Sequence, residues 1–163
     1  MKLTILVGTM SSTANSVAQA VQLACSDLVG DIEVTLMDDL DIGIFEAGKV
    51  ANTLYLICSS TYGSGDVPDN ARTLFESLSA QPQYLGHVRY GVMALGDSCY
   101  PQTFCFGGKQ FDTALQDLGG QRLGEIWCHD ASSGIPPETD GAAWGHLWLS
   151  SALQTVSVSS AAA

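Results

Sequence analysis

Apolar residues along the chain form short runs whose pattern predicts strands. Continuous apolar runs occupy Lys2–Gly8, Thr53–Ser60 and Val88–Gly96, and each ends in small or turn-forming residues. Such runs are typical of strands that are buried on both faces. Ile32–Leu40 instead alternates apolar and polar residues over its first half, which predicts a half-covered edge strand. Gln121–Asp130 is expected to form the fifth strand.

Between these runs, apolar residues recur at helical spacing. The expected helices are Ser16–Leu28, Val67–Leu78, Phe106–Leu118 and Glu138–Gln154. We expect the last of them to pack Trp144, Leu147 and Trp148 onto the sheet. Gly119 and Gly120 predict a left-handed cap after the third helix, since glycine has no Cβ to clash there.

The alternation of strands and helices predicts an α/β fold. Five strands joined by helices favour a doubly wound parallel sheet with right-handed crossovers and helices on both faces. Length and hydrophobic content suit one domain, expected over residues 1–154. Residues 155–163 are small and polar, and we expect them to fray.

The net charge of the chain limits the classes of partner that it is expected to bind. A net charge of −11 disfavours nucleic acid and anionic membrane surfaces, which attract basic patches, and it fits a basic protein partner. Acidity that merely aids solubility is the alternative. With no signal core and no apolar run of spanning length, we expect a cytoplasmic protein without a membrane segment.

The cysteines and histidines give no sign of a metal or disulfide site. The five cysteines form no CxxC pair and one is left over, which suits free, structurally buried thiols in a reducing compartment. Two of them, Cys99 and Cys105, fall in a candidate site loop. His87, His129 and His146 lack the spacing of metal ligands, so no metal is expected.

Loops after the first, third and fourth strands should meet, because parallel strands end at one edge of the sheet. The first, Gly8–Asn15, is rich in hydroxyl groups and enters a helix, so it suits a phosphate. It has no lysine and no GxGxxG pattern, which disfavours a nucleoside triphosphate or dinucleotide. Taken alone, this loop is more typical of a Ser/Thr-rich helix cap.

The other two loops each present a tyrosine. Tyr62 lies beside Gly63 and Gly65, and Tyr100 precedes Pro101. Read alone, the Tyr62 loop is equally an ordinary turn. Together with the first loop, the two tyrosines predict a pocket for a planar ring that bears one phosphate.

From Lys2 to about Leu149, in collinear order, the chain resembles the flavodoxin family. GTMSSTAN is similar to the family's phosphate loop and SSTYGSGDVPDN to its first flavin loop. ALGDSCYP and the following FCFGGKQFD are similar to the second flavin loop and the helix after it. The nearest resemblance is to short-chain, MioC-type flavodoxins and to the flavin domains of sulfite and cytochrome P-450 reductases. It implies sheet order 2-1-3-4-5 and noncovalent FMN.

The resemblance also implies which residues bind FMN. In the phosphate loop these are Thr9, Met10, Ser11, Ser12, Thr13, Ala14 and Asn15. In the second loop they are Ser60, Thr61, Tyr62, Gly63, Ser64 and Gly65, and in the third Leu95, Gly96, Asp97, Tyr100, Phe104 and Cys105. By analogy, Tyr100 covers the outer face of the flavin and Tyr62 the inner face. The peptide N–H groups of residues 96–99 would bind its pyrimidine edge, and the Gly63 carbonyl would accept from N5 after one-electron reduction.

The chain departs from the family at a few positions. Ser12 replaces a usual glycine, Ala14 stands where longer flavodoxins often have threonine, and the loop between Tyr100 and Phe104 is one residue longer. The fifth strand has no long insertion, as in short-chain members.

The resemblance implies an electron carrier rather than an enzyme. It would be a monomer that shuttles single electrons at low potential, in transient contacts, from a flavodoxin reductase with a basic patch to a redox acceptor enzyme. A cofactor-free interaction module and a NAD(P)H quinone reductase remain as alternatives.

Overall fold

The computed structural model describes residues 1–162, with side chains through residue 159. Its strands are β1 (Lys2–Gly8), β2 (Asp31–Leu36), β3 (Thr53–Ser59), β4 (Arg89–Gly96), β5 (Gln121–Arg122) and β6 (Trp127–Asp130). Its α-helices are α1 (Thr13–Ala24), α2 (Ala47–Val50), α3 (Arg72–Ala80), α4 (Phe106–Asp117) and α5 (Pro137–Ala162). Short 3₁₀ helices span Ile42–Phe45, Asp69–Ala71, Pro101–Thr103 and Ala131–Ser133.

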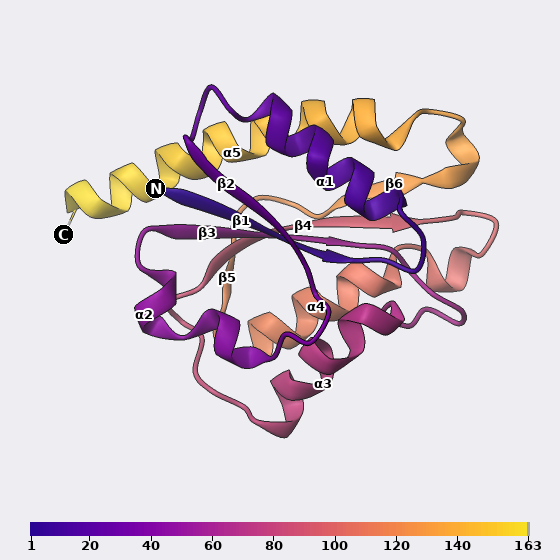
Figure 1. Ribbon diagram of the computed structural model, residues 1–163, viewed down its shortest axis with the longest axis horizontal. Helices are drawn as coiled ribbons and strands as arrows, with labels where there is room; N and C mark the ends of the chain where they lie inside the picture. The colour runs from indigo at the N-terminus through magenta and orange to yellow at the C-terminus, as the bar shows by residue number, and fades with distance from the viewer. Residues whose placement is uncertain (163) are drawn as a thin grey trace.

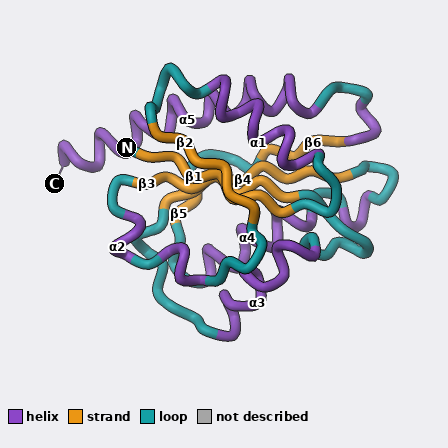
Figure 2. The backbone as a smooth tube through the Cα atoms, viewed as in Figure 1, coloured by secondary structure: helices purple, strands orange, loops and turns teal. Residues whose placement is uncertain are grey.

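All strand pairs in the sheet are parallel, in the order β2-β1-β3-β4-β5, with β6 also paired to β4. This confirms the predicted doubly wound α/β fold. Helices α1 and α5 cover one face and α2, α3 and α4 lie on the other (Figure 1). The tube view shows the strands as a middle layer between the two groups of helices (Figure 2).

Side chains on both faces of the central strands are buried. Along β1, Leu3, Ile5 and Val7 pack in the core under α1 and α5, whereas Leu6 belongs to the core on the α3 and α4 side. The continuous apolar runs in the sequence follow from this double coverage.

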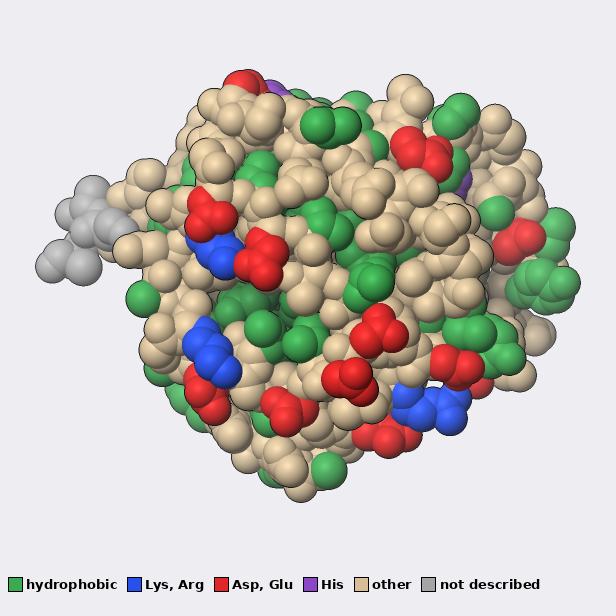
Figure 3. All heavy atoms as spheres, in the orientation of Figure 1, with side chains coloured by type: hydrophobic (Ala, Val, Ile, Leu, Met, Phe, Trp, Pro, Cys, Tyr) green, Lys and Arg blue, Asp and Glu red, His purple; other side chains and the backbone are tan. Residues whose placement is uncertain are grey.

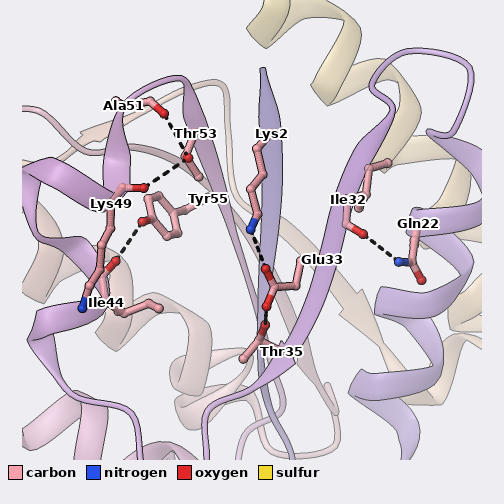
Figure 4. Close-up of polar contacts among 10 residues, drawn as sticks. All are labelled: Lys2, Gln22, Ile32, Glu33, Thr35, Ile44, Lys49, Ala51, Thr53 and Tyr55. Atoms are coloured by element: carbon pink, nitrogen blue, oxygen red, sulfur yellow. Dashed lines mark hydrogen bonds and ion pairs between the residues drawn. The ribbon is translucent and has the colours of Figure 1, made fainter.

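The edge strand β2 has the predicted mixture of exposed and partly buried residues. On its exposed side Lys2 Nζ of β1 lies 2.6 Å from Glu33 Oε2, and the Thr35 hydroxyl donates to Glu33 (Figure 4). On its other side, Gln22 of α1 donates to the Ile32 carbonyl at 2.8 Å. The edge is therefore held by polar contacts where the apolar core ends.

The fifth strand differs from the prediction, because it is divided into β5 and β6. Gly124 has a φ of +73°, so the chain turns out of the extended conformation between the two pieces. Both pieces pair with β4, and the indole N–H of Trp148 donates to the Leu123 carbonyl at 2.8 Å within the interruption.

The last helix also differs from the prediction, both in its length and in which leucine faces the core. Helix α5 continues to Ala162, beyond the predicted end at Gln154, and residue 163 lies outside the described residues. No glycine or proline interrupts this end of the chain, and the hydroxyls of Thr155 and Ser157 donate to carbonyls four residues earlier. Trp148 packs in the core as expected, but Leu147 is 70% exposed, and the neighbouring Leu149 is buried instead.

The starts of two helices next to the site also differ from the prediction. Helix α1 begins at Thr13, inside the hydroxyl-rich loop, because the Ser12 carbonyl already accepts from the Ser16 N–H. The helix expected from Val67 begins at Arg72 after a 3₁₀ turn. Sequence periodicity also missed α2 and the 3₁₀ turn before it, where the Tyr55 hydroxyl donates to the Ile44 carbonyl (Figure 4).

Candidate functional site

The three loops predicted to meet do surround one hollow at the carboxyl edge of the sheet. Its volume is ≈ 570 Å³. The lining residues are Met10, Ser11, Thr13, Ser60, Thr61, Tyr62, Gly63, Leu95, Gly96, Asp97, Tyr100, Thr103 and Ala131. This edge lies at the right of Figure 1, where the strand arrows end.

The first loop ends at the amino terminus of α1. Ser11 Oγ and Thr13 Oγ1 lie 3.3 Å apart, and both line the hollow. Ser12, at the N-cap position, makes no capping hydrogen bond, and the N–H groups of Ala14 and Asn15 have no acceptor among the described residues. Free N–H groups at the positive end of a helix, beside two hydroxyls, form a site for an anion.

The second loop is a tight turn closed by two backbone hydrogen bonds between Tyr62 and Asp66, of 2.9 and 2.8 Å. Gly63 and Gly65 have φ values of +53° and +100°, which glycine adopts without steric cost. The turn presents Tyr62 at the hollow with 43% of its surface exposed.

Thr61 connects the second loop to the third. Its hydroxyl donates to the Leu95 carbonyl at 2.9 Å and accepts from the Gly107 N–H at 3.0 Å. The Thr61 side chain is thereby committed to holding the loops together, although it also lines the hollow.

The third loop is fixed by the segment that follows β6. The Ser132 hydroxyl donates to Asp97 Oδ1 at 2.5 Å, and the same oxygen accepts from the Cys99 N–H at 2.9 Å. From the other side, Asp130 Oδ1 accepts from the N–H groups of Ser98 and Ser132, both at 2.9 Å. The loop carries Tyr100 at its tip with 68% of the side chain exposed.

These contacts change the acidity of both carboxyl groups. The hydrogen bond from Ser132, with that from Cys99, lowers the pKa of Asp97 below its ordinary value. Hydrogen bonds from Ser98, with that from Ser132, lower the pKa of Asp130. In this structure the N–H groups of Ser98 and Cys99, which were predicted to bind the pyrimidine edge of a flavin, bind the carboxylates of Asp130 and Asp97.

Most residues predicted for the site lie at the hollow, but some do not line it. Those outside its lining are Thr9, Ser12, Ala14, Asn15, Ser64, Gly65, Phe104 and Cys105. Ala14 and Cys105 are fully buried, and the Cys105 thiol points to the Ala94 carbonyl at 3.4 Å. The Thr9 N–H donates to Asn70 at 2.8 Å.

Sequence reasoning missed Thr103 and Ala131 at the hollow, and Asp130 and Ser132 behind it. One signal was available, because Asp130, Ala131 and Ser132 follow the last strand at the same sheet edge as the three loops.

The chemistry of the hollow fits FMN. Hydroxyls and unpaired N–H groups at α1 suit its phosphate, and Tyr62 and Tyr100 offer aromatic surface for its ring. The residue types therefore match a planar ring with one phosphate.

The chain matches known proteins over most of its length. The family model described as flavodoxin matches residues 5–144. Flavodoxin YqcA of Pectobacterium carotovorum is 35% identical over 148 residues, which are 88% of this chain and 92% of that protein. Flavodoxin YqcA of Escherichia coli is 45% identical over 93 residues, and the match spans only 57% of this chain and 62% of the relative's length.

Longer proteins and solved structures agree with these matches. The sulfite reductase [NADPH] flavoprotein alpha-component of Vibrio cholerae is 41% identical over 125 residues, 76% of this chain and 20% of that protein. The solved structure of a cysteine-to-alanine mutant of flavodoxin from Pseudomonas aeruginosa has a TM-score of 0.76 and 31% identity, covering 93% of this chain and 98% of that one. The chain therefore belongs to the flavodoxin family, whose cofactor is FMN.

Proposed function

We propose that the protein is a low-potential carrier of single electrons that takes them from a reductase and passes them to an acceptor enzyme. The observation that supports this most is the convergence of a phosphate-suited helix terminus and two exposed tyrosines on one hollow. Bound FMN supplies the redox chemistry, and the protein binds it and sets its potential.

The phosphate is assigned to Ser11, Thr13 and the free N–H groups of the first turn of α1. No lysine or arginine lies in this loop, so binding relies on hydroxyls, peptide dipoles and the helix terminus. Ser12 adds a hydroxyl where the family usually has glycine, and its peptide N–H has no acceptor among the described residues.

The ring is assigned to the space between Tyr62 and Tyr100. Gly63, at the edge of this space, has a left-handed backbone, and the residue is free to rotate its peptide because no Cβ opposes the change. An acceptor carbonyl at Gly63 would favour the form that carries one added electron and proton, and so would raise the potential of the first reduction step.

We assign two roles to the acidic side chains around the hollow: they lower the reduction potential of the flavin, and they attract a basic redox partner. Asp66 and Asp97 lie in the second and third loops, and their negative charge opposes the addition of a second electron. Asp69 has a different role, because it pairs with Arg72 at 3.3 Å. On the face in Figure 3, acidic side chains predominate and the basic ones lie next to them, which favours a partner with a basic patch.

The test is the visible spectrum of the purified protein, with FMN added where needed, during stepwise reduction. We expect tight FMN binding, two separate one-electron steps, and electron transfer from a reductase that slows as ionic strength rises. A colourless protein that does not bind FMN would support the interaction module instead. Steady turnover of quinone with NAD(P)H and no reductase would support the quinone reductase.

Within the residues that the structure describes, no helix is both long enough and apolar enough to cross a membrane.

A further inference from the structure

Two of the cysteines lie together behind the third loop. The thiol of Cys105, the residue before α4, lies 3.4 Å from the Ala94 carbonyl of β4 and 3.8 Å from the His129 carbonyl of β6. Ala94 and Cys128 are direct partners across β4 and β6, and His129 follows Cys128. The two carbonyls thus place the Cys105 sulfur next to Cys128.

Both side chains lie on the same side of the sheet. Trp127 and His129 are buried, and Trp127 belongs to the core under α1 and α5, so the intervening Cys128 points to the α4 side. Cys105 belongs to the core on that side. The pair therefore meets beneath the start of α4.

The two thiols differ in accessibility. Cys105 is fully buried, whereas Cys128 is exposed. A reagent in solution can reach Cys128 directly, and Cys105 is positioned to react only with what is already attached to Cys128.

The backbone holds Cys105 in an unusual conformation. Its φ is +60°, and in the described part of the chain the other non-glycine residues with positive φ are Asp39 and Asn52. Asp and Asn adopt this region more readily than other residues do, whereas cysteine gains no such local hydrogen bond. The strained turn fixes the thiol against β6.

The surroundings also favour a thiolate at the exposed position. The adjacent Cys105 thiol lowers the pKa of Cys128, and the charge of Lys109 acts in the same direction. Interaction with Cys128, together with burial, raises the pKa of Cys105. Burial raises the pKa of Cys25 to about 11 and that of Cys58 to about 12, so these two core thiols lack such activation.

We propose that Cys128 and Cys105 form a reversible dithiol–disulfide pair, in which exposed Cys128 attacks low-molecular-weight disulfides and buried Cys105 closes the protein disulfide. Thiolate attack on a disulfide, followed by attack of a neighbouring thiol, is the general route of exchange. This site is separate from electron transfer by FMN, and it does not depend on the proposed function.

The exchange balances with a small disulfide RSSR as the oxidant. The Cys128 thiolate forms a bond to one sulfur of RSSR as the S–S bond breaks and RS⁻ leaves. Cys105 then gives up its proton and attacks the Cys128 sulfur, which forms the protein disulfide and releases the second RS⁻. The two protons of the protein thiols end on the two released thiols, so two electrons pass from the protein to RSSR.

The experiment uses the reduced full-length protein loaded with FMN and exposed to oxidised glutathione. Cleavage after Lys109 and Arg122 puts Cys128 in the carboxyl-terminal peptide, and Cys99 and Cys105 together in the peptide that starts at Tyr90. We expect these two peptides to be linked under non-reducing conditions, without bound glutathione, and to separate on reduction. Cys99→Ser is the matched control, since it removes the other cysteine of that peptide and must leave the link in place.

The variant Cys105→Ala should stop the reaction halfway, with one glutathione retained on Cys128. Because Cys105 is buried, its replacement could disturb the fold. The linked peptides of the native chain test the proposal without any substitution in the core. Loss of the link in Cys99→Ser, a stable glutathione adduct on Cys128 in the native chain, or unmodified Cys128 would each overturn the proposal.

Discussion

The Ser132 hydroxyl donates a 2.5 Å hydrogen bond to Asp97 Oδ1, which ties the loop carrying Tyr100 to the segment after β6. Cys99 donates to the same oxygen, so one carboxylate organises the backbone of the loop and its connection to the neighbouring strand. The Ser132 side chain thus positions the third loop.

Replacing Ser132 by alanine should weaken FMN binding while leaving the protein folded. Loss of the hydrogen bond to Asp97 loosens the loop that carries Tyr100, so the Kd should rise several-fold. Fluorescence titration with FMN measures this. Ser133→Ala is the control, because Ser133 lies in the same turn and, among the described residues, its hydroxyl accepts from the Ile135 N–H and makes no hydrogen bond to Asp97. Equal effects of both variants would show that Ser132 acts only through the turn.

Acid should weaken the third loop. Asp97 and Asp130 have folded-state pKa values lowered below those of the unfolded chain. Their contribution to the stability of the folded state is therefore complete above the unfolded-state pKa of about 4. It is lost as the pH falls through the lower, folded-state pKa values. Stability measured by denaturant titration should fall with decreasing pH below about 4, and the slope should be smaller in Asp97→Asn. Asp130→Asn should reduce the slope in the same way, since the pKa of Asp130 is also lowered.

Tyr100→Ala should raise the Kd for FMN about tenfold, because stacking on an aromatic side chain contributes about 1–3 kcal/mol per base in nucleic-acid complexes. The potential of the second reduction step should rise as well, since an electron-rich ring is removed from beside the negatively charged reduced flavin. Tyr100→Phe keeps the ring and should bind nearly as the native protein does. If the phenylalanine variant bound as weakly as the alanine variant, the hydroxyl rather than stacking would be responsible.

Gly63→Val should lower the potential of the first reduction step, since a β-branched residue hinders rotation of the peptide that offers its carbonyl. The native φ of +53° also makes the substitution destabilising, by about 1–2 kcal/mol. Gly134→Val separates the two effects, because Gly134 has a φ of +74° with open space around it and lies outside the lining of the hollow. Potentiometric titration should show the shift only in the Gly63 variant.

Gly91→Ala should destabilise the sheet without directly affecting the site. A Cβ at Gly91 would lie 2.4 Å from the Trp148 ring, which is buried at 6% exposure and cannot easily move. Overpacking of this kind costs about 1–3 kcal/mol, so the thermal midpoint should fall by several degrees. A Cβ added at Gly30 would meet no atom of the described residues within 4 Å, so Gly30→Ala should stay close to the native midpoint. A Gly91 variant of native stability would mean that Trp148 repacks freely.

The fold class, the alternation of strands and helices, and the three loops of the site could be predicted from the pattern of residues alone. Apolar runs such as those of β1, β3 and β4 exist because both faces of each strand are covered, so local pattern and tertiary environment coincide there. The tyrosines and hydroxyl-rich loop were also visible, because parallel topology alone brings strand ends together.

The contacts that hold the loops and bring two thiols together could not be predicted from the sequence, because they join residues that are distant along the chain. Ser132 and Asp97 are 35 residues apart. The Cys105 thiol contacts Ala94, which is 11 residues away and is the partner of Cys128 in the sheet. Neither contact follows a helical or strand period. The division of the fifth strand at Gly124 and the burial of Leu149 in place of Leu147 likewise depend on packing against β4 and the other core residues. Periodicity reports which face of an element is apolar, whereas contacts between distant loops depend on the three-dimensional path of the chain.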